Sequence, residues 1–177
     1  MYTPAPIISH SADFSQMIPK VPPGPIAEFG VFEGGSTVQL AGYGRTVYAF
    51  DTFEGMPYDA PYDPWLDQDN PPGQFRSDHV IEHLAEYHNV ICVKGTFQKT
   101  LPEFDPEVKF AFVYLDCDWY SSYRFVCEWL AKRMLPGAMA LVDDYRYCAG
   151  CHKAIDEMVK EGIVTYLHPW MRWPEKQ

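Results

Sequence analysis

Two short apolar runs in this chain each end directly in aspartates. The first run is Phe110–Leu115 and the second is Ala138–Val142. The aspartates that follow them are Asp116, Asp118, Asp143 and Asp144. A continuous apolar run of this length is typical of a strand buried on both faces, as in a parallel sheet covered by helices. Ligands of such open sheets bind at the carboxyl ends of the strands, so we expect the four carboxylates to meet in one crevice.

Four carboxylates in one crevice repel one another, and a bound divalent cation relieves that repulsion. Carboxylate oxygens favour a hard cation such as Mg²⁺, Ca²⁺ or Mn²⁺ over zinc. The sequence therefore predicts a metal site. The alternative is that an aspartate such as Asp118 only caps the helix that follows it.

Strand-like and helix-like segments alternate along the rest of the chain. The further predicted strands are Ile26–Gly30, Thr46–Phe50 and Asn89–Val93. The predicted helices are Ser36–Ala41, Ser77–His88, Tyr120–Met134 and Cys151–Glu161, and we expect Pro136-Gly137 to stop the third of them. Two last strands, Ile163–Leu167 and Met171–Trp173, have no helix between them and are expected to form a hairpin. This order predicts an α/β fold: a mostly parallel twisted sheet with a C-terminal antiparallel hairpin and helices on both faces.

The chain divides into a lead-in segment and one domain. Residues 1–25 are rich in proline and are expected to form an N-terminal arm. Residues 26–177 are expected to form a single domain. Residues 56–75 form a loop insertion with no periodicity, crowded with Pro, Asp and aromatic residues. Loops of that length are often lids or binding loops. A poorly ordered acidic surface loop is the other interpretation.

A glycine turn follows the first predicted strand, within Glu28–Ser36. Glycines let the backbone approach a ligand, and a helix N-terminus follows. Asp51 lies about 20 residues further on, where a carboxylate can accept both hydroxyls of a ribose. Phe32 stands where a pyrophosphate-binding turn needs a small residue, which disfavours a nicotinamide or flavin cofactor. An adenosine with an amino-acid tail fits better, as in S-adenosylmethionine.

Composition excludes several kinds of partner. A formal net charge of −10 argues against nucleic acid, whose binders need a basic surface. No apolar run approaches the roughly 20 residues of a membrane span, and the first residues do not resemble a secretory signal. Five cysteines without export indicate reduced thiols, so we expect a cytoplasmic protein.

Several segments together resemble the macrocin-type O-methyltransferases, which are metal-dependent and methylate sugar hydroxyls in antibiotic biosynthesis. The segments occur in the family's order, from about Ile26 to Trp173. They read EFGVFEGGST, FDTFEGMP, VKGTFQKTLP, YLDCDWY, LVDDY and CHKAIDEM. The resemblance implies a Rossmann-like class I methyltransferase fold, an S-adenosylmethionine cofactor with Mg²⁺, and a small-molecule hydroxyl acceptor, either a sugar or a phenolic natural product. A homo-oligomer is compatible with the sequence.

The resemblance also implies roles for single residues. The glycine segment would hold the methionine part of the cofactor, and Asp51 would bind the ribose. The segment after the third strand would lie near the adenine. The implied cofactor-binding residues are Glu28, Gly30, Glu33, Gly34, Gly35, Ser36, Asp51, Thr52, Gly95, Thr96, Phe97 and Asp116. The implied metal ligands are Asp116, Asp143 and Asp144, and the implied catalytic base is Asp118.

The chain departs from the family pattern in two places. The family usually has a helical N-terminal segment, whereas this chain has the proline-rich residues 1–25. The family also commonly reads L-Y-E-S where this chain has Trp119-Tyr120-Ser121-Ser122. Two other functions remain open at this point. Asp116-Cys117-Asp118 could be the D-x-D motif of a metal-dependent glycosyltransferase, which leaves the glycine segment without a role. The chain could also be a non-catalytic module that binds S-adenosylmethionine.

Overall fold

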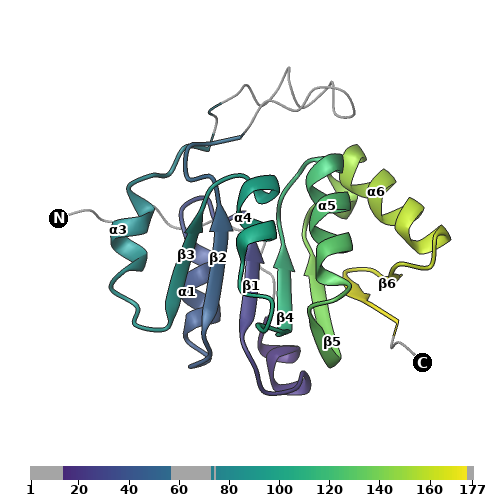
Figure 1. The fold of residues 1–177 in the computed structure, drawn as a ribbon, viewed down its shortest axis with the longest axis horizontal. Helices are drawn as coiled ribbons and strands as arrows, with labels where there is room; N and C mark the ends of the chain where they lie inside the picture. The colour runs from purple at the N-terminus through teal and green to yellow at the C-terminus, as the bar shows by residue number, and fades with distance from the viewer. Residues whose placement is uncertain (1–13, 57–72, 74, 175–177) are drawn as a thin grey trace.

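The computed structural model describes residues 14–56, 73 and 75–174, and its centre is a seven-stranded sheet (Figure 1). The strands follow the order β3-β2-β1-β4-β5-β7-β6. The first five pair in parallel, and β7 pairs antiparallel with both β5 and β6. The predicted α/β fold, including the C-terminal antiparallel hairpin, is confirmed.

The strands carry the apolar runs that the sequence indicated. Their bounds are β1 Ile26–Phe29, β2 Val47–Asp51, β3 Val90–Lys94, β4 Phe110–Leu115, β5 Met134–Val142, β6 Thr165–Leu167 and β7 Trp170–Arg172. Every residue of β1 and β4 is buried. These two neighbours occupy the centre of the sheet, which explains why neither shows the apolar–polar alternation of a half-exposed strand.

Helices cover both faces of the sheet. Their bounds are α1 Gly35–Ala41, α3 Val80–Leu84, α4 Phe97–Glu103, α5 Tyr120–Leu130 and α6 Ala149–Lys160, with a 3₁₀ turn at Asp144–Arg146. In the view of Figure 1, α4 and α5 lie in front of the sheet and α1 lies behind it. The front core includes Phe29, Phe50 and Leu130, and the rear core includes Leu40 and Phe112.

Part of the proline-rich lead-in packs into the rear core. Two short 3₁₀ helices, η1 Phe14–Gln16 and η2 Ile18–Lys20, precede β1. The Phe14 ring makes edge-to-face contacts with Phe112 and Tyr114 of β4, with centroids 6.0 Å and 5.2 Å apart. This segment therefore covers apolar surface of the central strand, which would otherwise face solvent.

Several predicted element boundaries were wrong, and the helix predicted as Ser77–His88 covers only Val80–Leu84. The helix predicted as Tyr120–Met134 ends at Leu130, and Pro136-Gly137 lie inside β5 instead of stopping that helix. Met134 pairs with Phe110, and the register shifts between Phe110 and Phe112. The prediction was wrong because Met134 also fits the apolar face of a helix. Whether Met134 joins a strand depends on its pairing with β4, which a local pattern does not show.

Helix α4 was not predicted. It is only seven residues long and contains Pro102, so its sequence lacks a helical pattern. Packing stabilises it instead: the Trp129 indole of α5 donates a hydrogen bond to the Leu101 carbonyl at 2.9 Å.

Most of the loop predicted at 56–75 lies outside the described residues. No helix in the described ranges is both long and apolar enough to cross a membrane.

Candidate active site at the carboxyl edge of the sheet

The strand-end aspartates meet at one edge of the sheet, as expected. The amide of Asp116 donates to the Phe29 carbonyl, and the amide of Asp143 donates to the Leu115 carbonyl, both at 2.9 Å. These bonds extend the parallel pairing of β1, β4 and β5 by one step. The two carboxylates are therefore fixed on a rigid part of the sheet.

Three carboxylates there have the spacing of a cation site. One oxygen each from Asp116, Asp143 and Asp144 lies within 4.8 Å of the other two. A second group of three, Asp118, Asp144 and Cys148, meets the same criterion and shares Asp144. The all-oxygen set fits Mg²⁺ or another hard cation, so the residues present are suited to the predicted metal.

Neighbouring hydroxyls hold these carboxylates in place. The Tyr114 hydroxyl donates to Asp143 Oδ1 at 2.9 Å. The Tyr123 hydroxyl lies 2.7 Å from Asp144 Oδ2 and 3.0 Å from the Leu115 carbonyl. Such outer contacts orient ligands toward a metal.

Burial and mutual repulsion disfavour the charged forms of these acids. Burial, followed by the charges of Asp144, Asp143 and Asp118, raises the pKa of Asp116 well above its ordinary value. Burial and the Asp118 charge raise the pKa of Asp144 to about 8. A divalent cation would remove this penalty, because its charge offsets the repulsion.

Asp118 lies beside the three-carboxylate group in a strained conformation. Its φ is +55°, in the left-handed region that residues with a side chain seldom adopt. Its amide donates to Asp144 Oδ2 at 3.0 Å, and the Cys148 thiol lies 3.7 Å from its Oδ1. The N-cap position of α5 is Trp119, so Asp118 does not occupy the capping position proposed as its alternative role.

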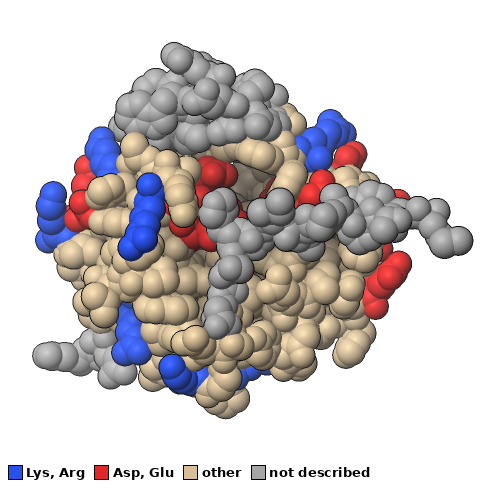
Figure 2. All heavy atoms as spheres, turned by 180° about the vertical axis from the view of Figure 1, so that it is seen from behind, with Lys and Arg blue, Asp and Glu red and all other residues tan. Residues whose placement is uncertain are grey.

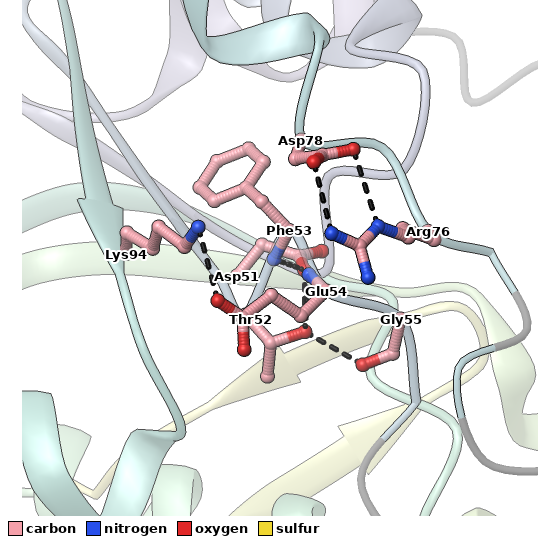
Figure 3. A network of polar contacts seen from close by, with 8 residues as sticks. All are labelled: Asp51, Thr52, Phe53, Glu54, Gly55, Arg76, Asp78 and Lys94. Atoms are coloured by element: carbon pink, nitrogen blue, oxygen red, sulfur yellow. Dashed lines mark hydrogen bonds and ion pairs between the residues drawn. The ribbon is translucent and has the colours of Figure 1, made fainter.

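Asp51, the last residue of β2, contacts both the glycine turn and the segment that follows β2, and the second of these contacts is drawn in Figure 3. Its Oδ2 accepts the Val31 amide at 2.7 Å, and its Oδ1 accepts the Phe53 amide at 2.7 Å. Each oxygen has only a longer second contact, from the Phe32 amide to Oδ2 at 3.5 Å and from the Thr52 hydroxyl to Oδ1 at 3.4 Å, which a ligand hydroxyl could replace. Around it in Figure 3, the Thr52 hydroxyl donates to the Gly55 carbonyl at 2.6 Å, and Lys94 pairs with Glu54 at 3.1 Å.

Gly30 allows β1 and β4 to approach closely where the site begins. Its φ is +91°, and a Cβ placed there would lie 1.6 Å from the Asp116 carbonyl oxygen. No other amino acid fits this position without moving the backbone. The glycine that the sequence singled out is thus required by the geometry of the site itself.

A pocket of about 510 Å³ opens at this edge. That volume is within the range of small-molecule sites. In Figure 2, acidic side chains border a hollow in the upper half of the molecule, the same end toward which the parallel strands point in Figure 1. The predicted site residues that line the pocket are Gly30, Asp51, Thr52, Thr96, Phe97, Asp116 and Asp118.

Other predicted site residues lie outside the pocket lining. They are Glu28, Glu33, Gly34, Gly35, Ser36, Gly95, Asp143 and Asp144. Glu28 is fully buried, and its carboxylate accepts the hydroxyls of Ser36 and Thr37 at the start of α1. The geometry therefore gives Glu28 a structural contact between β1 and α1.

Several pocket residues were not identified from the sequence as site residues. They include Phe32, Gln98, Cys117, Trp119 and Ser122, while Met56 and Phe75, the two ends of the loop predicted at 56–75, also line the pocket. Trp119 follows directly on the D-x-D segment, and its proximity to Asp118 was the only signal in the sequence. The contact of Trp119 with Met56 joins segments 63 positions apart and could not be read from a local pattern.

Comparison with known proteins agrees with this geometry. The family model of macrocin O-methyltransferases (TylF) matches residues 13–167. A Streptomyces olivaceus protein, 8-demethyl-8-(2,3-dimethoxy-alpha-L-rhamnosyl)-tetracenomycin-C 4'-O-methyltransferase, is 31% identical over 153 residues, covering 76% of this chain and 58% of the relative. Demethyldecarbamoylnovobiocin O-methyltransferase of Streptomyces niveus is 28% identical over 152 residues, with the same coverage.

A solved structure of the O-methyltransferase NovP is also similar. It superposes with a TM-score of 0.70 at 26% identity, covering 93% of this chain and 76% of that chain. This chain spans less than two thirds of the length of the curated relatives it matches. Because the family model covers most of the sequence, the chain belongs to the macrocin O-methyltransferase family.

Proposed function

We propose that this chain is an S-adenosylmethionine-dependent O-methyltransferase that acts, with a divalent cation, on a hydroxyl of a sugar-bearing natural product. The substrate class rests on the relatives, whose names describe O-methylation of a rhamnosyl tetracenomycin and of a novobiocin precursor. The chemistry rests on the site. The acceptor class and the metal are both part of the proposal.

The observation that carries the proposal is the convergence of two sets of residues on one pocket edge. Asp51 and Gly30 line the side next to the glycine turn, where an adenosine with an amino-acid tail would bind. Asp116 belongs both to that lining and to the carboxylate group with Asp143 and Asp144. A ligand site and a cation site therefore share a residue.

The residues divide the chemistry between them. Bound S-adenosylmethionine supplies an electrophilic methyl group, and a bound Mg²⁺ lowers the pKa of a nearby alcohol. Asp116, Asp143 and Asp144 would hold the cation, and Asp51 would accept the ribose hydroxyls. Asp118 would accept the proton from the acceptor hydroxyl as a general base.

The direct test is turnover of the Asp143→Ala variant. The assay measures S-adenosylhomocysteine formed with Mg²⁺ and the sugar-bearing acceptors named for the relatives. We expect Asp143→Ala to lose activity by about 100-fold or more, because one of three cation ligands is gone. Asp105→Ala, which removes an exposed carboxylate before β4, is the matched control and should retain activity.

Cofactor binding is measured separately by thermal shift. S-adenosylhomocysteine should raise the melting temperature of the wild type and of Asp143→Ala alike, because Asp143 does not line the pocket. UDP-glucose should not raise it, which separates this function from a glycosyltransferase. Wild-type turnover in Asp143→Ala would remove the cation from the mechanism, and no shift with S-adenosylhomocysteine would refute the cofactor.

A further inference from the structure

The Trp119 indole is a buried donor with no acceptor in the described part of the chain. Its side chain is 3% exposed, and Nε1 has no hydrogen-bond partner among the residues that the structure describes. An indole N–H can only donate, and buried Trp side chains usually find a partner. An unpaired buried N–H is therefore a sign that the partner arrives with a ligand.

The rest of Trp119 is rigidly positioned. Its amide donates to the Cys117 carbonyl at 2.6 Å, and its carbonyl accepts the Tyr123 amide at 3.0 Å in the first turn of α5. The ring packs against Met56 and lines the 510 Å³ pocket. The indole is thus fixed in the wall of the pocket. Because Nε1 itself is buried, the neighbouring side chains must shift slightly for a ligand oxygen to reach it.

Trp129 of α5 and Trp173 near the C-terminus show what a satisfied indole looks like here. Trp129 donates to the Leu101 carbonyl at 2.9 Å, and Trp173 donates to the Cys127 carbonyl at 3.0 Å. Both stabilise packing between elements. Trp119 differs from them because it lines a pocket and its indole has no acceptor within residues 14–56, 73 and 75–174.

We propose that Trp119 Nε1–H donates a hydrogen bond to an oxygen of the methyl acceptor and so fixes the position of the acceptor ring. This inference rests on the proposed function. The acceptor is favoured over the cofactor because Trp119 directly follows Asp118, the residue placed to take the acceptor's proton. The residues assigned to the ribose and adenine, Asp51 and Phe97, come from other strand ends.

The test observes the indole N–H itself. Protein labelled with ¹⁵N at the indole nitrogens has five tryptophans, and the signal absent from Trp119→Phe belongs to Trp119. S-adenosylhomocysteine with Mg²⁺ is added first, and then methyl α-L-rhamnopyranoside, a neutral sugar with only hydroxyl and ether oxygens. We expect a saturable downfield shift of the Trp119 indole proton on addition of the sugar, while the Trp129 and Trp173 signals stay in place.

Each outcome decides the proposal. A Trp119 shift with S-adenosylhomocysteine alone would assign the indole to the cofactor and overturn the proposal. A Trp119 signal that moves in neither step would overturn it too, whatever the other signals do. Failure of the proposed function is seen separately, as a melting temperature that S-adenosylhomocysteine does not raise and as no turnover by the wild type.

Kinetics give a second measurement. Loss of one hydrogen bond in Trp119→Phe should raise KM for the acceptor by about 2- to 10-fold while KM for S-adenosylmethionine stays unchanged. Trp173→Phe removes an indole whose bond lies outside the pocket, and it should change neither constant. A Trp119→Phe variant that folds, by its melting temperature, and keeps the wild-type acceptor KM contradicts the proposal.

Discussion

The buried Glu28 provides a sharp test of the electrostatics beneath the glycine turn. Its carboxyl is fully buried, and burial raises its pKa from 4.5 to about 7, against the opposing effect of hydrogen bonds from Ser36 and Thr37. A folded pKa above the unfolded pKa means that protonation stabilises the fold. That stabilisation is complete below about pH 4.5, is lost progressively up to about pH 7, and is then absent.

The perturbation is Glu28→Gln, which keeps the shape and cannot ionise. Its amide keeps one acceptor oxygen, and its NH2 group donates to the second hydroxyl where the carboxylate accepted from it. At about 1.4 kcal/mol for each unit of pKa difference, wild-type stability should fall relative to the variant by about 2 to 3 kcal/mol between pH 5 and pH 8. Most of the change should occur below pH 7. Above that pH the difference should become constant.

The assay is urea unfolding of both proteins, followed by circular dichroism at pH 5, 6, 7 and 8. The difference between the two unfolding free energies isolates Glu28 from the other titrating groups. Glu103→Gln, an exposed glutamate on α4, controls for the loss of one negative charge. A difference that does not change with pH would refute the reasoning, because Glu28 would then have the same pKa in the folded and unfolded chains.

Three other predictions concern the site. Gly30→Ala should destabilise the protein by about 3 kcal/mol or more in urea unfolding, because the Cβ of the alanine would overlap the Asp116 carbonyl oxygen. Unchanged stability would contradict the close approach of β1 and β4 at this position. Tyr123→Phe should weaken Mg²⁺ binding by about 10-fold in calorimetry, because Asp144 loses a hydroxyl that orients it, and equal affinity would contradict that role. Raising the pH from 6 to 8 should strengthen Mg²⁺ binding by up to about 50-fold, because Asp144, with a pKa of about 8, must lose its proton to bind the cation. A thermal shift at fixed Mg²⁺ that does not grow with pH would contradict this.

The alternation of strands and helices along the chain and the meeting of the terminal aspartates at one sheet edge could be predicted, because strand ends are local features of the sequence. Phe110–Leu115 is apolar throughout and ends in Asp116, and the parallel connections leave one edge for that carboxylate. The same reasoning located Asp51 at the end of β2. The short helix α4 was missed because packing, more than its own sequence, stabilises it.

The boundary between α5 and β5 shows where local pattern fails. The spacing of Leu130 and Met134 suits one helix face, yet Met134 pairs with Phe110. Which structure forms depends on the neighbouring strand, because backbone pairing with β4 satisfies hydrogen bonds that a longer helix would satisfy internally. Similarly, only tertiary contacts show that Phe14 packs into the rear core.

The sequence by itself determined the α/β class, the edge at which a ligand would bind and the aspartates that gather there, because strand ends and glycine turns are local features. Tertiary structure decided what each buried polar group does. Glu28 binds two hydroxyls of α1 although it belongs to the glycine motif. Trp119 lines the pocket, and its indole N–H has no partner in the part of the chain that the structure describes. Burial and hydrogen-bond satisfaction depend on residues distant in the chain, so only the folded structure reveals them.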